Sequence, residues 1–165
     1  MATITLKGNE IHTNGTLPEV GAAAPEFSLA GADLSNKSLA DFAGQRKVLN
    51  VFPSVDTPVC ALSVKAFNAQ AASKDNTVVL NVSADLPFAL KRFCGAEGIE
   101  GAVTLSSFRS NFAQEYGLEI TDGPLAGLCS RAVLVLDENN NVVYTEQVPE
   151  IAQEPNYEAA LNALG

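Results

Sequence analysis

Residues 48–67, VLNVFPSVDTPVCALSVKAF, constrain the fold of this chain more than any other stretch. The apolar residues at its start predict a buried strand, which Pro53 ends. Thr57 then stands where a helix N-cap would, and Pro58 takes the first helical position, where a missing N–H costs nothing. The stretch therefore predicts a buried strand, a turn and a capped helix.

Cys60 is the third residue of that predicted helix. Its sulfur would face the positive end of the helix dipole and several backbone N–H groups that have no partner within the helix. Such a position favours the thiolate, which is the reactive form of cysteine. We therefore expect Cys60 to act as a nucleophile.

Composition excludes several other classes of protein. The 165 residues can bury the core of one domain without metals or disulfides, and the net charge of −9 argues against nucleic-acid binding. We find no signal peptide or membrane span and expect a cytoplasmic protein, in which cysteines are not structural staples. The three widely spaced cysteines and the single His12 match no zinc pattern, so no metal site is expected.

The rest of the chain predicts alternating strands and helices in an α/β fold, with a mixed sheet covered by helices on both faces. We expect one domain over 1–165, with an N-terminal hairpin extension in residues 1–16. Asp85 is expected to cap the second main helix, and Gly95 to lie just past its end. The expected strands are Thr3–Leu6, Glu10–Thr13, Phe27–Leu29, Val78–Val82, Val103–Leu105, Ala132–Leu136 and Val142–Thr145, and the later helices are Leu86–Cys94, Phe108–Tyr116 and one that begins at Pro155.

Pro53, Thr57 and Cys60 form the pattern P-x-x-x-T-x-x-C, which resembles the active-site signature of the peroxiredoxins, thiol peroxidases with a thioredoxin fold. The segments FPSVDTPVC, SADLPFALKRFCGAEG and GLCSRAVLVLDENNNVVY resemble the bacterial thiol peroxidase branch, and the likeness covers the whole chain. It implies reduction of hydrogen peroxide and alkyl hydroperoxides by an atypical two-cysteine mechanism within one subunit. It also implies thioredoxin as reductant, a homodimer and no cofactor.

The chemistry of the individual residues agrees with this resemblance. The Thr57 hydroxyl can reach across the first helical turn toward the sulfur or a peroxide oxygen, and Pro53 can shield the pocket from water without adding an N–H. Arg131 begins a later strand, and its guanidinium can hold thiolate and peroxide at once. The resemblance assigns the same roles to these residues and to Cys60.

Cys94 is expected at the C-terminal end of its helix, where the dipole disfavours a thiolate. Cys60 should therefore attack first, and Cys94 should resolve the resulting sulfenic acid as a Cys60–Cys94 disulfide. A disulfide requires Cα atoms within roughly 7 Å of each other, so we expect helix 86–94 to unfold partly on oxidation.

Some alternatives stay open. Cys129 is expected to be a small buried apolar residue, although strand alternation could place it near Arg131. His12 is expected on the surface, so a Cys–His catalytic pair has little support. A redox sensor that passes oxidation to a client shares the first chemical step with a peroxidase. A general disulfide oxidoreductase is a weaker candidate, because position 57 is Thr and the C-x-x-C motif is missing.

Overall fold

The structure is a computed structural model that describes residues 1–71, 74–99 and 101–164. A seven-stranded mixed sheet forms its centre, in the strand order β4-β3-β7-β6-β5-β8-β9. The strands of this sheet are β3 (Leu29–Ala30), β4 (Asn36–Lys37), β5 (Arg46–Val51), β6 (Thr77–Ser83), β7 (Val103–Ser106), β8 (Ala132–Leu136) and β9 (Val142–Gln147). β5, β6 and β7 run parallel, whereas β8 pairs antiparallel with both β5 and β9.

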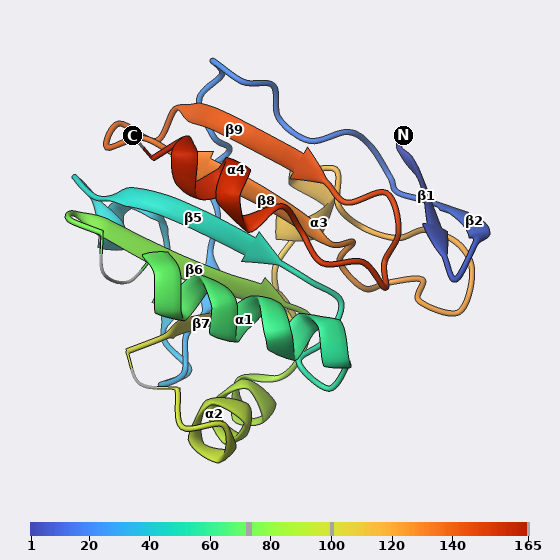
Figure 1. Ribbon diagram of the computed structural model, residues 1–165, viewed down its shortest axis with the longest axis horizontal. Coiled ribbons are helices and arrows are strands. Elements are labelled where there is room, and N and C mark those ends of the chain that lie inside the picture. The colour runs from blue at the N-terminus through green and yellow to red at the C-terminus, as the bar shows by residue number, and fades with distance from the viewer. Residues whose placement is uncertain (72–73, 100, 165) are drawn as a thin grey trace.

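Helices cover both faces of the sheet. α1 (Pro58–Ala71) and α4 (Tyr157–Asn162) lie on one face and α3 (Phe112–Glu115) on the other, while α2 (Pro87–Ala96) lies below the sheet next to α1 (Figure 1). A short 3₁₀ helix, η1 (Leu39–Phe42), precedes β5. None of the helices in the described part of the chain has both the length and the apolar character needed to cross a membrane.

Strand alternation explains the two apolar layers. Val48 and Val133 point to the α1 face, where Phe67 packs on them, and Leu49 points to the opposite face, which Phe112 covers. All five of these side chains are fully buried, as expected for strands covered on both sides. β5 and β6 both end at fully buried residues, Val51 and Ser83, and the loop after β5 leads directly into α1.

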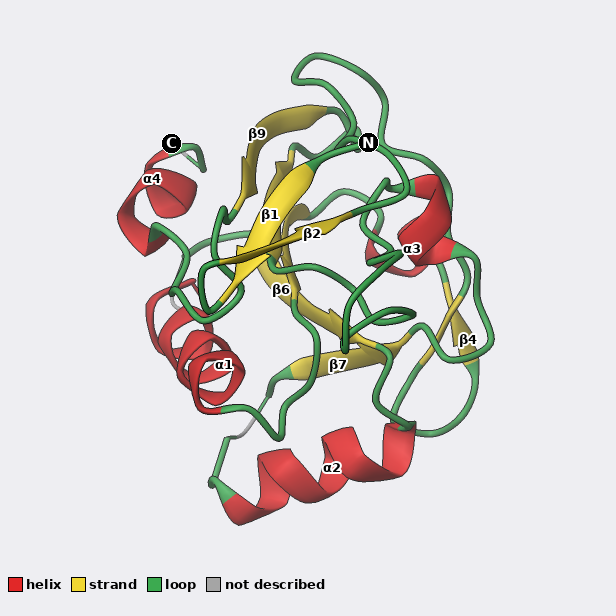
Figure 2. Ribbon diagram, turned by 90° about the vertical axis from the view of Figure 1, so that its right-hand side faces the viewer, coloured by secondary structure: helices red, strands yellow, loops and turns green. Residues whose placement is uncertain are grey.

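The N-terminal hairpin forms a separate two-stranded sheet of β1 (Thr3–Leu6) and β2 (Asn9–His12). Ile4 and Ile11 face each other across it and pack on Ile120 and Ile151 of the main domain. Figure 2 shows the hairpin in front of the sheet, well apart from α2. The predicted mixed α/β fold with an N-terminal hairpin is therefore confirmed.

Several predicted helix boundaries were wrong, and the closing helix begins at Tyr157 rather than at Pro155. The expected helix Phe108–Tyr116 is only the short α3, because the hydroxyls of Ser106 and Ser110 accept the N–H groups of Phe108 and Phe112 and hold 107–111 in a turn. α2 continues through Gly95 to Ala96, so this glycine lies inside the last turn rather than past it.

The predicted cap of α2 was also wrong. Leu86 occupies the N-cap position, and no side chain caps the helix. The Asp85 carboxylate instead accepts hydrogen bonds from the loop before α1, as described below.

Candidate active site

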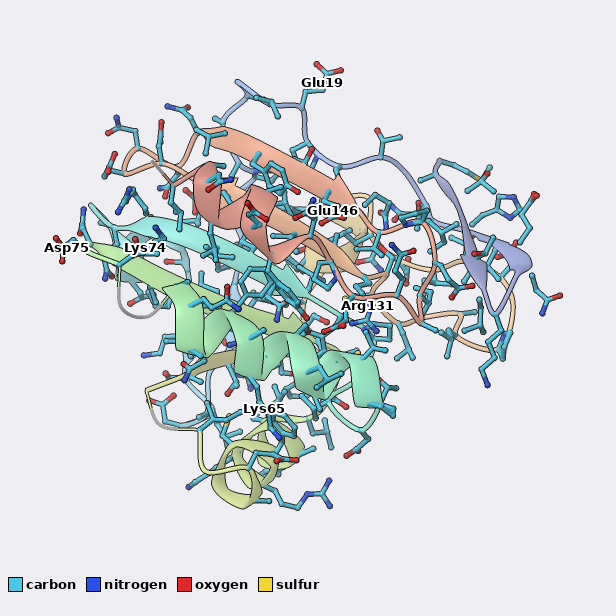
Figure 3. All side chains as sticks on the ribbon, viewed as in Figure 1. Glu19, Lys65, Lys74, Asp75, Arg131 and Glu146 are labelled. Carbon is cyan, nitrogen blue, oxygen red and sulfur yellow. The ribbon has the colours of Figure 1, made fainter. Side chains whose placement is uncertain are left out.

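Cys60 and Arg131 meet beneath the first turn of α1. Cys60 is fully buried, and Arg131, which directly precedes β8, is 2% exposed. The Arg131 Nη2 donates to the Cys60 Sγ over 3.1 Å. Figure 3 labels Arg131 beside the N-terminal end of α1, where β5 ends. A positive charge therefore lies against a sulfur that already faces the positive end of a helix.

The remaining nitrogens of the Arg131 guanidinium have different surroundings. Nε donates to the backbone oxygen of Ile151 over 2.8 Å, which fixes the plane of the group. Nη1 is buried and has no hydrogen-bond partner among the described residues. A buried charged donor without a protein partner is costly, so Nη1 has a hydrogen bond left to offer on the guanidinium that contacts Cys60.

Thr57 and Pro53 lie in the loop between β5 and α1. The Thr57 hydroxyl donates to the Ser54 backbone oxygen over 2.9 Å, so in this structure its proton points into the turn rather than toward the sulfur. Its side chain is half-buried, one helical turn before Cys60. Pro53 is buried and has no N–H that would compete for the sulfur.

Asp85 ties this loop to the neighbouring strand. Its carboxylate accepts hydrogen bonds from the Ser54 hydroxyl at 2.7 Å, the Val55 N–H at 2.9 Å and the Ser83 hydroxyl at 2.7 Å. Because Asp85 also directly precedes the N-cap of α2, one carboxylate joins the loop that carries Thr57 to the helix that carries Cys94.

Cys94 lies in the last turn of α2 and packs against the apolar cluster that contains Cys60 and Phe93. It is half-buried, and burial raises the pKa of its thiol. Cys60 and Cys94 are not bonded to each other in the structure. The structure thus places both candidate redox cysteines around one apolar cluster between α1 and α2.

Two ion pairs join α2 and the residue after it to α1 and to the loop before α1. Lys65 of α1 lies 2.7 Å from Glu97, which follows α2, and Arg92 of α2 lies 3.3 Å from Asp56 of the loop. A cleft of about 510 Å³ opens between α1 and α2 and is lined by Thr57, among others. This cleft brings solvent to within one helical turn of Cys60.

The other two candidates lie outside this arrangement. Cys129 is 1% exposed, as predicted, and burial raises the pKa of its thiol to about 11. Its nearest polar partner is the Ser107 hydroxyl at 3.8 Å. His12 lies on the hairpin, where its ring contacts Asp122 at 2.7 Å and Glu10 at 3.1 Å.

Sequence reasoning missed three groups that support the site. The Ile151 carbonyl holds Arg131, but a backbone acceptor has no signature in the residue type. The buried Ser63 hydroxyl donates to the Cys60 carbonyl over 2.9 Å and accepts from Asn50. Only Asp85 carried a signal, since an acidic residue between a strand and a proline is either a cap or a loop anchor.

Comparisons with known proteins give one consistent result. A family model described as Redoxin matches residues 19–161. A thiol peroxidase of Mycobacterium tuberculosis (strain ATCC 25618 / H37Rv) is 59% identical over 165 residues, which cover 100% of this chain and 99% of that protein.

Solved structures agree with this match. A peroxiredoxin-like protein from Aquifex aeolicus has 39% identity and a TM-score of 0.92, over 98% of this chain and 95% of the other. A thiol peroxidase from Chromobacterium violaceum has a TM-score of 0.91 over the same shares of the two chains. Its 23% identity supports the fold alone.

Proposed function

Because the chain belongs to the Redoxin family and is a thiol peroxidase, we propose that Cys60 is the thiol that attacks the peroxide. The contact between the Cys60 sulfur and Arg131 Nη2 carries this proposal. Among the residues that the structure describes, no arginine or lysine donates to the Cys94 sulfur, and burial of Cys129 raises the pKa of its thiol to about 11. Of the three thiols, Cys60 is therefore the one whose thiolate has a charged partner.

The first step is a two-electron oxidation of Cys60. Its thiolate attacks one peroxide oxygen, an S–O bond forms and the O–O bond breaks. The other oxygen leaves as an alkoxide or hydroxide, which takes up a proton to become alcohol or water. Arg131 Nη1 has a free donor for the peroxide oxygen, and the Thr57 hydroxyl, now bonded to Ser54, is a second donor within one turn.

The second step forms the Cys60–Cys94 disulfide. The Cys94 thiolate attacks the sulfenic sulfur, the S–S bond forms, and the oxygen leaves as water after protonation. Burial of Cys94 within α2 raises the pKa of its thiol and holds the thiol in the helix, so this step requires the end of α2 to open. Pro53 keeps the wall of the pocket free of competing donors during both steps.

We further propose that thioredoxin reduces the disulfide, that alkyl hydroperoxides are substrates beside hydrogen peroxide, and that the protein works as a homodimer. Because thioredoxin works where thiols are kept reduced, we propose a cytoplasmic location for the protein. No cofactor takes part, because the sulfur itself accepts the oxygen and thioredoxin supplies both electrons.

Turnover of cysteine variants tests the proposal. With thioredoxin, thioredoxin reductase and NADPH, the wild type should oxidise NADPH for as long as peroxide is supplied. Cys60→Ser should lose all activity, whereas Cys94→Ser should consume one equivalent of peroxide and then stop. Cys129→Ser is the matched control and should keep wild-type turnover. A wild-type protein that stops after one equivalent would instead be a redox sensor.

A further inference from the structure

The N-terminal hairpin reaches the site through the segment that follows β9 (Figure 1). Thr5 of β1 and Glu150 form an isolated parallel bridge. The Thr5 N–H donates to the Pro149 oxygen and the Ile151 N–H donates to the Thr5 oxygen, each over 2.8 Å. Residues 149–151 are thereby held against β1.

Ile151 connects residues 149–151 to the Cys60 thiol. Its N–H is bound by Thr5, and its carbonyl oxygen accepts the Nε of Arg131 over 2.8 Å. Arg131 Nη2 in turn donates to Cys60 Sγ over 3.1 Å. Hydrogen bonds on both sides of Ile151 therefore link the backbone of β1, through this residue and Arg131, to the sulfur. The Ile151 side chain is buried against the hairpin, which restrains the same residue a second time.

The Glu150 carboxylate fastens the two segments together. Oε1 accepts the Thr5 hydroxyl at 3.0 Å and the Gly8 N–H at 2.9 Å, and Oε2 accepts the Ala152 N–H at 2.8 Å. Two of these donors belong to the hairpin, and the third is the residue directly after Ile151. These backbone N–H groups, that of Ala152 first, hold the pKa of Glu150 below its usual value, so the carboxylate is charged at neutral pH.

We propose that the hairpin is a positioning element of the active site, and that Glu150 is the positioning residue through which it keeps Arg131 aimed at the Cys60 sulfur. The inference rests on the proposed role of Arg131. The guanidinium has only two hydrogen bonds among the described residues, to Ile151 and to the sulfur. The first of them therefore sets the direction of the second and of the free Nη1, and a small displacement of aligned groups is enough to slow a reaction strongly.

A double-mutant cycle tests this coupling. The rate constant for reaction of the reduced thiol with hydrogen peroxide is measured, by competition with a haem peroxidase, for wild type, Glu150→Ala, Arg131→Met and the double variant. Glu150→Ala should slow the wild type about tenfold. In the Arg131→Met background the same change should slow the reaction less than about twofold, because Glu150 acts through the guanidinium. An equal loss in both backgrounds would overturn the inference, since a merely structural role does not depend on Arg131.

Two further variants keep the test decisive. Thr5→Val keeps the shape of the side chain and removes one Glu150 contact, so it should show a weaker loss with the same dependence on Arg131, even if Glu150→Ala does not fold. Asp122→Ala removes the acceptor of the His12 N–H (2.7 Å) from the other hairpin strand and should leave the rate within about twofold. A loss in Asp122→Ala as large as that in Glu150→Ala would refute the assignment of this role to Glu150.

The cycle distinguishes the role of Arg131 from that of Glu150. A wild-type rate in Arg131→Met would refute the proposed function of Arg131 and this inference together. A slow Arg131→Met combined with an additive effect of Glu150→Ala would refute the positioning role alone.

Discussion

Replacement of Arg131 by Met should slow the reaction of Cys60 with peroxide but leave the free energy of unfolding almost unchanged. The change removes Nη2, which lies 3.1 Å from the Cys60 sulfur, the free donor Nη1 and the positive charge, while it keeps a long apolar side chain in the same space. Loss of one such donor from a site without water slows catalysis about 10²-fold to 10³-fold. Since two donors and a charge disappear together, we expect the peroxide reaction to slow about 10³-fold.

The free energy of unfolding should hardly change in the same variant. The Ile151 carbonyl loses its donor, which costs about 1–3 kcal/mol. In return the fold no longer buries a cation with an unpartnered nitrogen, and the removal of such a group is often neutral or stabilising by a similar amount. The two effects should cancel to within about 1 kcal/mol.

Two measurements on the reduced protein check this prediction. The second-order rate constant with hydrogen peroxide comes from competition kinetics, and the free energy of unfolding comes from urea denaturation followed by circular dichroism. Arg131→Lys is the matched control, because it keeps the charge but loses the planar guanidinium whose Nε and Nη2 donate separately to Ile151 and the sulfur, and it should have an intermediate rate. A rate within about threefold of wild type, or a loss of stability of several kcal/mol that accompanies the lost rate, would refute the reasoning.

Three other predictions concern the surroundings of the site. Asp85→Ala removes three hydrogen bonds to a carboxylate and should lower the free energy of unfolding by about 3 kcal/mol, and a urea midpoint equal to wild type would contradict this. Glu97→Gln breaks the ion pair with Lys65 and should speed formation of the Cys60–Cys94 disulfide by up to about fivefold. High salt should speed disulfide formation in the wild type but not in the variant. Quenched-flow mapping of disulfide-linked peptides measures this rate, and an unchanged rate in Glu97→Gln would be contrary evidence. Burial raises the pKa of Cys129 from 9.0 to about 11, so the folded protein holds the thiol proton more tightly than the unfolded chain does. The free energy of unfolding should therefore fall as the pH rises from about 9 to about 11. In Cys129→Ala this decline, measured by urea unfolding at each pH, should be smaller. The same decline in wild type and variant would disprove the link to the Cys129 thiol.

The local part of the site was predictable from the sequence. The start of α1 at Pro58, and with it the position of Cys60 in the first turn, follows from adjacent residues whose conformational preferences agree. Arg131 was also expected near the sulfur, since the resemblance and the start of a central strand both indicate it. These features depend on short spacings and on side chains with a distinctive chemistry.

The parts that were not predictable depend on tertiary competition. Asp85 has the sequence context of a cap, but the donors of a distant loop bind its carboxylate instead. Gly95 was expected to end α2, yet packing carries the helix one residue further, and Gly98, with φ +65°, takes the left-handed conformation beyond it. The anchor of Arg131 is a backbone carbonyl, and no side chain reports where such a group will point.

The clamp between Thr5 and Glu150 has a consequence for biosynthesis. The two residues are 145 positions apart, so the contact closes a loop almost as long as the polypeptide, and contacts of such separation form late. A nascent chain that ends before residue 149 already carries Cys60 but lacks the acceptor that orients its guanidinium. By this reasoning the Cys60 thiol of such a chain has the start of α1 but no oriented guanidinium, and it should gain its full reactivity only when the last tenth of the chain has been made and β1 has folded onto it.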